Sequence, residues 1–141
     1  MKLKYLSLKE AENILPNIEC DIKKLININH ALSLLNSIDI KYENDYKNYE
    51  TRLQNIRLNK KFHYLSNNFF RILENLIKKG CFVKNLDEGI VDFYSFFDGR
   101  EIFLCWRIGE KTINYWHELE ETYNGRKPIS IIKRKKRNNI L

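Results

Sequence analysis

The glycines of this chain are confined to its second half. None occurs in residues 1–79, and the five that are present stand at positions 80, 89, 99, 109 and 125. Because glycine tolerates backbone conformations that other residues avoid, glycines about ten residues apart are typical of turns between short elements. The distribution predicts a helical N-terminal part, followed by a region of short strands joined by turns.

Between these glycines lie short segments rich in aromatic and β-branched residues, which favour strands. Strands are expected at 90–94, 101–108 and 112–117, and a further one at 81–84. Asp98-Gly99 and Gly109 can close hairpins, so the strands should form an antiparallel meander. Residues 118–123 predict a short helix that ends at Asn124-Gly125.

The strand expected at 101–108 alternates most clearly. One face, which we expect to be core, carries Ile102, Leu104, Trp106 and Ile108, and the other carries Glu101, Phe103, Cys105 and Arg107.

The first 79 residues show the three- and four-residue apolar spacing of amphipathic helices. Ser7 and Glu10 match a capping box that would start the first helix, and Pro16 predicts a kink or a restart near Leu15. A break could occur near Ser37, and a turn is expected at 58–61, before a second helix that ends at Gly80. Two such helices should pack as an antiparallel, coiled-coil-like hairpin, because neither can bury its apolar stripe alone.

The expected fold class is therefore α+β, with a long helical hairpin at 7–79 and a small β meander with a short terminal helix at 80–125. Both would belong to a single domain at 1–128, followed by a basic and disordered tail at 129–141.

The tail carries the whole excess charge. Of 25 basic residues, seven follow Gly125 and no acidic residue does, which leaves 18 basic and 18 acidic residues before it. Consecutive basic residues repel one another and can lie along phosphates, so non-specific RNA or DNA binding is one interpretation and a solubilising terminus is the other. The nucleic-acid-binding candidates are Lys133, Arg134, Lys135, Lys136 and Arg137.

Several short motifs resemble those of the prokaryotic family catalogued as domain of unknown function 2203. They are Tyr5-Leu6-Ser7-Leu8-Lys9-Glu10-Ala11, Leu15-Pro16, Gly80-Cys81-Phe82-Val83-Lys84-Asn85-Leu86-Asp87, Gly89-Ile90-Val91-Asp92-Phe93, Asp98-Gly99-Arg100-Glu101, Leu104-Cys105-Trp106-Arg107, Gly109-Glu110, Tyr115-Trp116-His117-Glu118 and Gly125-Arg126-Lys127-Pro128. The resemblance covers most of the chain up to Pro128 and implies a helical N-terminal part with a small C-terminal β region. It implies no activity, cofactor or catalytic residue.

Composition predicts a globular cytoplasmic protein without a membrane partner. Hydrophobic residues make up 43%, no apolar run reaches the length of a membrane span, and the N-terminus lacks the apolar core of a secretion signal. Cys20, Cys81 and Cys105 have no close pairing, which favours reduced, buried thiols over a disulfide framework or a zinc knuckle. A reactive Cys105 would need a base, and His117 is the only histidine in the β region.

His117 is the centre of the one constellation that could carry chemistry. If a helix follows it, Glu120 and Glu121 lie on its face, and turns could bring Asp92, Asp98 and Glu110 close. One histidine with two or three carboxylates could hold a divalent metal or act as an acid–base pair. The alternative is a half-buried packing histidine whose ring nitrogen bonds a carboxylate.

Phosphate loops and nucleophile elbows are absent, since no two glycines stand closer than nine positions. We therefore expect an interaction module that uses the helices for protein contacts, including homodimerisation, and needs no cofactor. The alternative is an acid–base or metal-dependent enzyme with His117, Glu121, Asp92 and Glu110 at its centre, in which His117 and Glu121 would be the metal ligands.

Overall fold

Two long helices and a five-stranded antiparallel sheet make up the chain, which confirms the α+β class. The structure is a computed structural model that describes residues 3–42 and 49–132. Helix α1 spans Leu8–Tyr42 and helix α2 spans Tyr49–Lys78; the strands are β1 (Cys81–Asn85), β2 (Ile90–Phe97), β3 (Arg100–Arg107), β4 (Tyr115–Glu118) and β5 (Lys127–Pro128).

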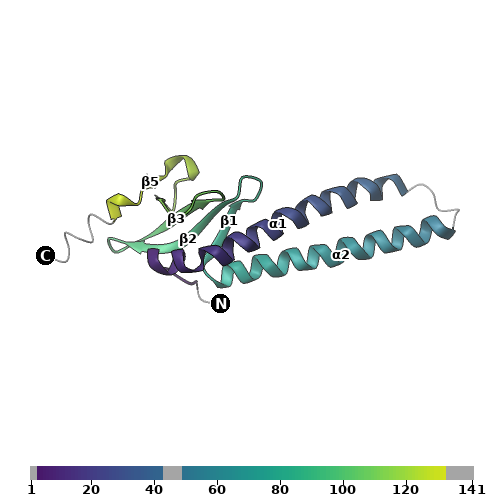
Figure 1. Cartoon of the computed structure of the whole chain (residues 1–141), viewed down its shortest axis with the longest axis horizontal. Helices are drawn as coiled ribbons and strands as arrows, with labels where there is room; N and C mark the ends of the chain where they lie inside the picture. Colours follow the sequence, from purple (N-terminus) through teal and green to yellow (C-terminus); the bar gives the residue numbers. More distant parts are fainter. Residues whose placement is uncertain (1–2, 43–48, 133–141) are drawn as a thin grey trace. The chain divides into compact units, whose positions relative to one another are not determined.

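The chain divides into two compact units, where the sequence suggested one domain. We call residues 23–74 the hairpin unit, and the described parts of residues 1–22 and 75–141 the sheet unit. In the hairpin unit α1 and α2 lie antiparallel, as the apolar stripes predicted (Figure 1). Helix α1 buries Leu25 and Leu35 there. Neither of the described helices combines the length and the apolar character needed to cross a membrane.

Helix α1 starts as predicted and continues as one helix through Pro16 and Ser37. Glu10 N donates to Ser7 Oγ at 3.1 Å and Ser7 N donates to Glu10 Oε1 at 3.3 Å, which confirms the capping box. The helix does not restart at Pro16, which lies inside it on the exposed side, because Leu15 and Ile18 on either side are held in the core. It also continues past Ser37 to Tyr42.

The turn expected at 58–61 is wrong. These residues lie inside α2, and the chain passes from one helix to the other between Tyr42 and Tyr49. Without glycine or proline nothing ends a helix at Asn59, and the apolar spacing continues through Leu58, Phe62 and Leu65 without a change of phase.

The sheet is a meander in which each strand pairs with the next, in the order β1-β2-β3-β4-β5. The tight turn between β2 and β3 has positive φ at both Asp98 (56°) and Gly99 (74°), which is the conformation that this dipeptide favours. β2 and β3 pair over their full length, so Asp92 lies opposite Cys105 and Phe93 lies opposite Leu104.

Both faces of the sheet are covered, although only one was expected to be core. Phe93, Leu104, Trp106 and Trp116 form the apolar face, which belongs to the same core as buried residues of α1 such as Ile18. Ile102 and Leu104 line a common cavity with Leu6, Leu8 and Ile132. Ile108 lies beyond the end of β3 and is half-buried.

The opposite face, which we call the polar face, carries buried residues as well. Asp92, Phe103, Cys105 and His117 share it by the two-residue period and are all buried.

The short α-helix predicted at 118–123 is also wrong. Glu118 is still paired with Ile102 as the last residue of β4, and a 3-10 helix follows at Tyr123–Gly125 before β5. The tail, which was expected to be disordered from residue 129, is ordered through Ile132: residues 130–132 are helical, and Ile129 and Ile132 are buried.

Candidate functional site

Three neighbouring strands bring Asp92, Cys105 and His117 together on the polar face. Asp92 in β2 lies opposite Cys105 in β3, and His117 in β4 lies opposite Phe103, one step along the same face. One ligand atom from each of the three lies within 4.8 Å of the other two, and all three side chains are buried. Residues from β2, β3 and β4 therefore meet at one polar cluster inside the sheet unit.

His117 has a partner at each ring nitrogen. Nδ1 lies 2.7 Å from the carbonyl oxygen of Glu118, and Nε2 lies 3.1 Å from Asp92 Oδ2. Burial alone lowers the pKa of His117, but the hydrogen bonds to Asp92 and to the Glu118 carbonyl outweigh it, so the pKa of His117 is raised. The ring is thus held in one orientation beside a carboxylate of opposite charge. This is the packing histidine that the sequence offered as the alternative to a ligand site.

A purely structural role for His117, as a buried ring bonded to a carboxylate, does not fully explain the position of Asp92. Its side chain is 1% exposed, and its second oxygen, Oδ1, has no hydrogen-bond partner among the described residues. Asp92 also lines a cavity of about 450 Å³ with Lys84 and Glu88 from the β1–β2 hairpin and with Glu121 and Tyr123 from the segment after β4. A buried carboxylate oxygen without a partner is costly, so this position suits a ligand that can satisfy it.

Cys105 is held as a neutral thiol. Burial raises its pKa to about 12, and the neighbouring Asp92 carboxylate adds to the shift. A thiol with such a pKa is a poor nucleophile at neutral pH, so the cluster does not activate Cys105 in the way that a reactive cysteine requires.

Arg126 lies beside Cys105, at the edge of the cluster. Its guanidinium lies 4.1 Å from the centre of the Tyr115 ring and 3.9 Å from that of the Tyr123 ring, and it donates to Glu110 Oε1 at 3.0 Å and to Tyr123 Oη at 2.9 Å. Its charge lowers the pKa of Cys105, against the larger effect of burial. Glu110 therefore reaches the cluster only through Arg126, and it also accepts a hydrogen bond from the backbone N–H of Arg107 at 2.6 Å.

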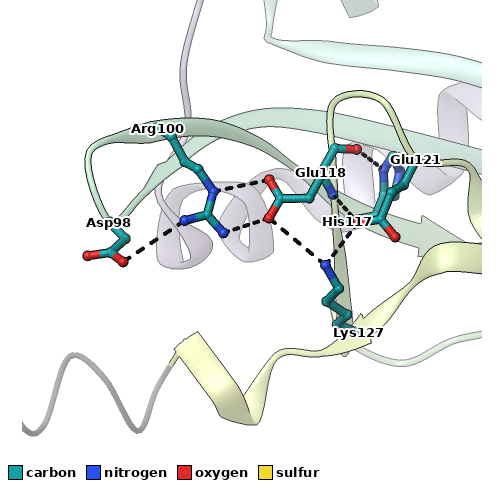
Figure 2. A network of polar contacts seen from close by, with 6 residues as sticks. All are labelled: Asp98, Arg100, His117, Glu118, Glu121 and Lys127. Atoms are coloured by element: carbon teal, nitrogen blue, oxygen red, sulfur yellow. Dashed lines mark hydrogen bonds and ion pairs between the residues drawn. The ribbon is translucent and has the colours of Figure 1, made fainter.

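A second polar network holds Glu118, the last residue of β4 (Figure 2). The carbonyl oxygen of Glu118 is the partner of His117 Nδ1. Arg100 donates to both carboxylate oxygens of Glu118, at 3.1 and 2.6 Å, and Lys127 Nζ lies 2.9 Å from Glu121 Oε1 and 3.9 Å from Glu118 Oε1. The Arg100 hydrogen bonds lower the pKa of Glu118, and the Lys127 hydrogen bond lowers that of Glu121. Asp98 joins the network at 4.0 Å from Arg100.

The predicted site residues thus have different places. Asp92 is hydrogen-bonded to His117. Glu121 lines the cavity that Asp92 also lines, from the loop after β4 rather than from a helix, and Glu120 is exposed. Sequence reasoning named His117 as the base that a reactive Cys105 would need, but it missed that Asp92 and Arg126 lie beside Cys105. The alternation had placed Cys105 on the correct face, but its neighbours depend on the strand register. The tail candidates Lys133, Arg134, Lys135, Lys136 and Arg137 lie outside the described residues.

Residues 4–129 match the family model described as an uncharacterized conserved protein, DUF2203. The chain belongs to this family. The match spans both helices and the whole sheet, and therefore includes Asp92, Cys105 and His117. No curated protein and no solved structure matches the chain.

Proposed function

We propose that this DUF2203 protein is an interaction module that pairs with a second copy of itself through the hairpin unit. The observation that carries the proposal is an exposed face of α2, on the side away from the apolar stripe of Phe62 and Leu65. The order of residues along this face would let it pair with the same face of a second copy. We call it the outer face of α2, and within the hairpin unit it consists of Tyr49, Arg52, Ile56, Asn59, His63, Asn67, Phe70 and Glu74.

The outer face presents large apolar side chains to solvent. Tyr49 is 78% exposed, Ile56 63% and Phe70 65%, at intervals of seven and fourteen residues that keep one face of a helix. Phe62 and Leu65, on the inner stripe, are half-buried. Large apolar residues repeated along one exposed helix face mark an association surface.

The order of residues along this face supports a two-fold, antiparallel pairing. If two copies of α2 cross with His63 at the centre, Ile56 of one copy comes opposite Phe70 of the other, and Asn59 comes opposite Asn67. Arg52 then comes opposite Glu74, which brings opposite charges together twice. An isologous interface needs such self-complementarity, because every contact occurs twice.

Burying Ile56 and Phe70 on both copies adds four apolar side chains, each worth about 1.5–3 kcal/mol when buried completely. Association costs about 4–15 kcal/mol in lost freedom of movement, so the dimer should be concentration-dependent rather than permanent.

The test is the molar mass of the full chain across a range of concentrations, by light scattering coupled to size exclusion. Wild type should shift from monomer to dimer as concentration rises, and the double variant Ile56→Lys with Phe70→Lys should stay monomeric. Leu34→Lys is the matched control, because Leu34 is 67% exposed but lies on α1. A monomer at all concentrations, or a dimer that persists in the double variant, would contradict the proposal.

The basic tail adds a second contact in this proposal, non-specific binding of RNA or DNA by Lys133–Arg137. If all five side chains engage duplex phosphates, affinity should fall with log salt at a slope of about −4 to −5. A chain ended after Ile132, which keeps the buried Ile132, should lose this binding. Equal binding by the shortened chain would show that the tail is only a solubilising end.

We also assign the protein to the cytoplasm. The free thiols Cys81 and Cys105 in the sheet core support a reducing compartment.

A second candidate function is acid–base or metal-dependent chemistry at His117 and Asp92, with Glu121 and Glu110 around them. It is favoured by the cavity that Asp92 lines and by the Oδ1 atom of that residue, which has no hydrogen-bond partner in the part of the chain that the structure describes. A thermal-shift screen of small molecules and divalent ions would test it, because a shift should disappear in Asp92→Asn and persist in Asp98→Asn, whose carboxylate is exposed. A shift unchanged in Asp92→Asn would place the ligand elsewhere.

A further inference from the structure

We propose that Asp92, Cys105 and His117 form a binding site for a zinc-type divalent cation, with one position open to the cavity. This rests on the second candidate function and makes it specific, since it names the ion and adds Cys105 as a ligand. The proposal concerns binding, so it can be tested without a substrate.

The three donor atoms already converge. They lie within 4.8 Å of one another, whereas zinc bonds of about 2.0–2.3 Å would place such donors roughly 3–4 Å apart. Each donor comes from a different strand of one continuous ladder, so the backbone holds the three side chains next to one another, and binding requires them to move closer together.

His117 is oriented as metal-binding histidines are. In such sites one ring nitrogen binds the ion while the other donates its proton to a carbonyl or a carboxylate. Here Nδ1 lies 2.7 Å from the Glu118 carbonyl oxygen, which leaves Nε2 pointing at Asp92. The Arg100–Glu118 ion pair holds the same residue through its side chain, so the orienting group is itself fixed.

Asp92 supplies an independent sign of a ligand. Its Oδ1 atom is buried without a hydrogen-bond partner among the described residues, and the residue lines the cavity. The proton that joins Asp92 Oδ2 to His117 Nε2 can satisfy only one carboxylate oxygen. A cation between the carboxylate, the thiolate and the imidazole would give Oδ1 the partner that it lacks.

The donor set selects the class of ion. One sulfur, one nitrogen and one oxygen donor suit Zn²⁺, while Mg²⁺ and Ca²⁺ require oxygen ligands. Three protein ligands, of which Asp92 lines a cavity, resemble open zinc sites that keep a position for water or a ligand, rather than closed structural sites. On binding, the thiol proton of Cys105 and the Nε2 proton of His117 pass to water, and Arg126 remains beside the sulfur.

The experiment is Zn²⁺ binding by the full chain in competition with a chromophoric chelator, followed by Co²⁺ absorption. All proteins would carry Cys20→Ser, because Cys20 is an exposed thiol. One ion per chain should bind, with a sulfur-to-cobalt charge-transfer band. Cys105→Ser should remove the band and weaken Zn²⁺ binding at least about tenfold, as should Asp92→Asn and His117→Gln.

Cys81→Ser is the matched control, since Cys81 is equally buried but lies on the apolar face, opposite Phe93. It should keep both the band and the affinity. Absence of Zn²⁺ binding in the wild type, or a band that survives Cys105→Ser, would overturn the proposal. If Asp92→Asn or His117→Gln fails to fold, the comparison of Cys105→Ser with Cys81→Ser still decides it.

The outcome is distinct from that of the other proposals. A small-molecule thermal shift that depends on Asp92, in a protein that binds no Zn²⁺, would overturn the metal site and leave the acid–base function standing. The dimer is tested in the hairpin unit, by residues that belong to neither site.

Discussion

The two units of this protein use similar residues in opposite ways. The sheet unit buries aromatic residues on both faces of the sheet, such as Phe93 and Phe103, and encloses a polar cluster. In the hairpin unit, by contrast, only Leu25 and Leu35 are buried among the described residues, while Tyr49, Tyr64 and Phe70 are mostly exposed. Covering two faces of a sheet creates a site that can exclude water. Two helices cover only one stripe each, and the side chains that they leave uncovered form the surface that we propose for self-pairing.

Substitution of one phenylalanine in each unit should give the largest difference in stability between the two units. Phe93→Ala removes a fully buried ring from the sheet, and it should lower the free energy of unfolding by about 3–5 kcal/mol. Phe70→Ala, in the hairpin unit, should change it by less than about 0.5 kcal/mol in dilute protein, since the ring is exposed there. Urea denaturation at two protein concentrations measures both effects, and similar losses in dilute protein would show that the units do not differ in this way.

Substitution of one histidine in each unit should give the next largest difference in stability. His117→Gln should cost about 1–3 kcal/mol, because it disrupts the hydrogen bonds to Asp92 and Glu118 inside the sheet unit. His30→Gln, at an exposed position of α1, should cost less than about 0.5 kcal/mol. Equal midpoints of denaturation for the two variants would mean that the polar cluster contributes nothing to the fold.

Exchanging the charges of Arg52 and Glu74 tests the antiparallel pairing proposed for the hairpin unit. Arg52→Glu alone should weaken the dimer, because it places two glutamates opposite each other at both ends of the pairing. Adding Glu74→Arg should restore the dimer, with each ion pair worth about 0.2–1 kcal/mol. Sedimentation equilibrium of the three proteins measures the effect. A double variant as weak as the single one would rule out the antiparallel register.

The smallest expected effect lies at the edge of the sheet unit. Tyr5 Oη donates to Glu101 Oε1 at 2.6 Å, and this hydrogen bond raises the pKa of Tyr5 above its ordinary value of 10.0. Because the folded-state pKa is the higher one, the stabilisation is present below pH 10 and is lost as pH rises above it. The stability difference between wild type and Tyr5→Phe should therefore shrink above pH 10, and a difference that stays constant would show that the hydroxyl does not contribute.

Local signals in the sequence predicted most of the fold. Ser7 and Glu10 marked the start of α1, Gly80 marked the end of α2, and Asp98-Gly99 marked the tight turn of the sheet. The connection between the helices was misplaced because an apolar stripe records which face is buried but not where the helix ends. Glu118 was expected in a helix because local propensity does not include its pairing with Ile102, which comes from a distant part of the chain.

The candidate site was only partly predictable for the same reason. His117 and the nearby carboxylates could be recognised by residue type, and Asp92 was among them. Choosing Asp92 over Glu110 or Glu121 as the partner of His117 requires the register of β2 on β3 and of β3 on β4. Cys105 became part of the cluster only through that register.

The most direct test of self-pairing through α2 is a cross-link at the predicted two-fold centre. In a Cys20→Ser background, His63→Cys places one new thiol on the outer face of each copy, and mild oxidation should join two chains. Arg71→Cys is the control, because two copies of residue 71 would lie about 24 Å apart at 1.5 Å per residue. A covalent dimer with His63→Cys and almost none with Arg71→Cys is the predicted result; no dimer, or equal yields at the two positions, would contradict the account.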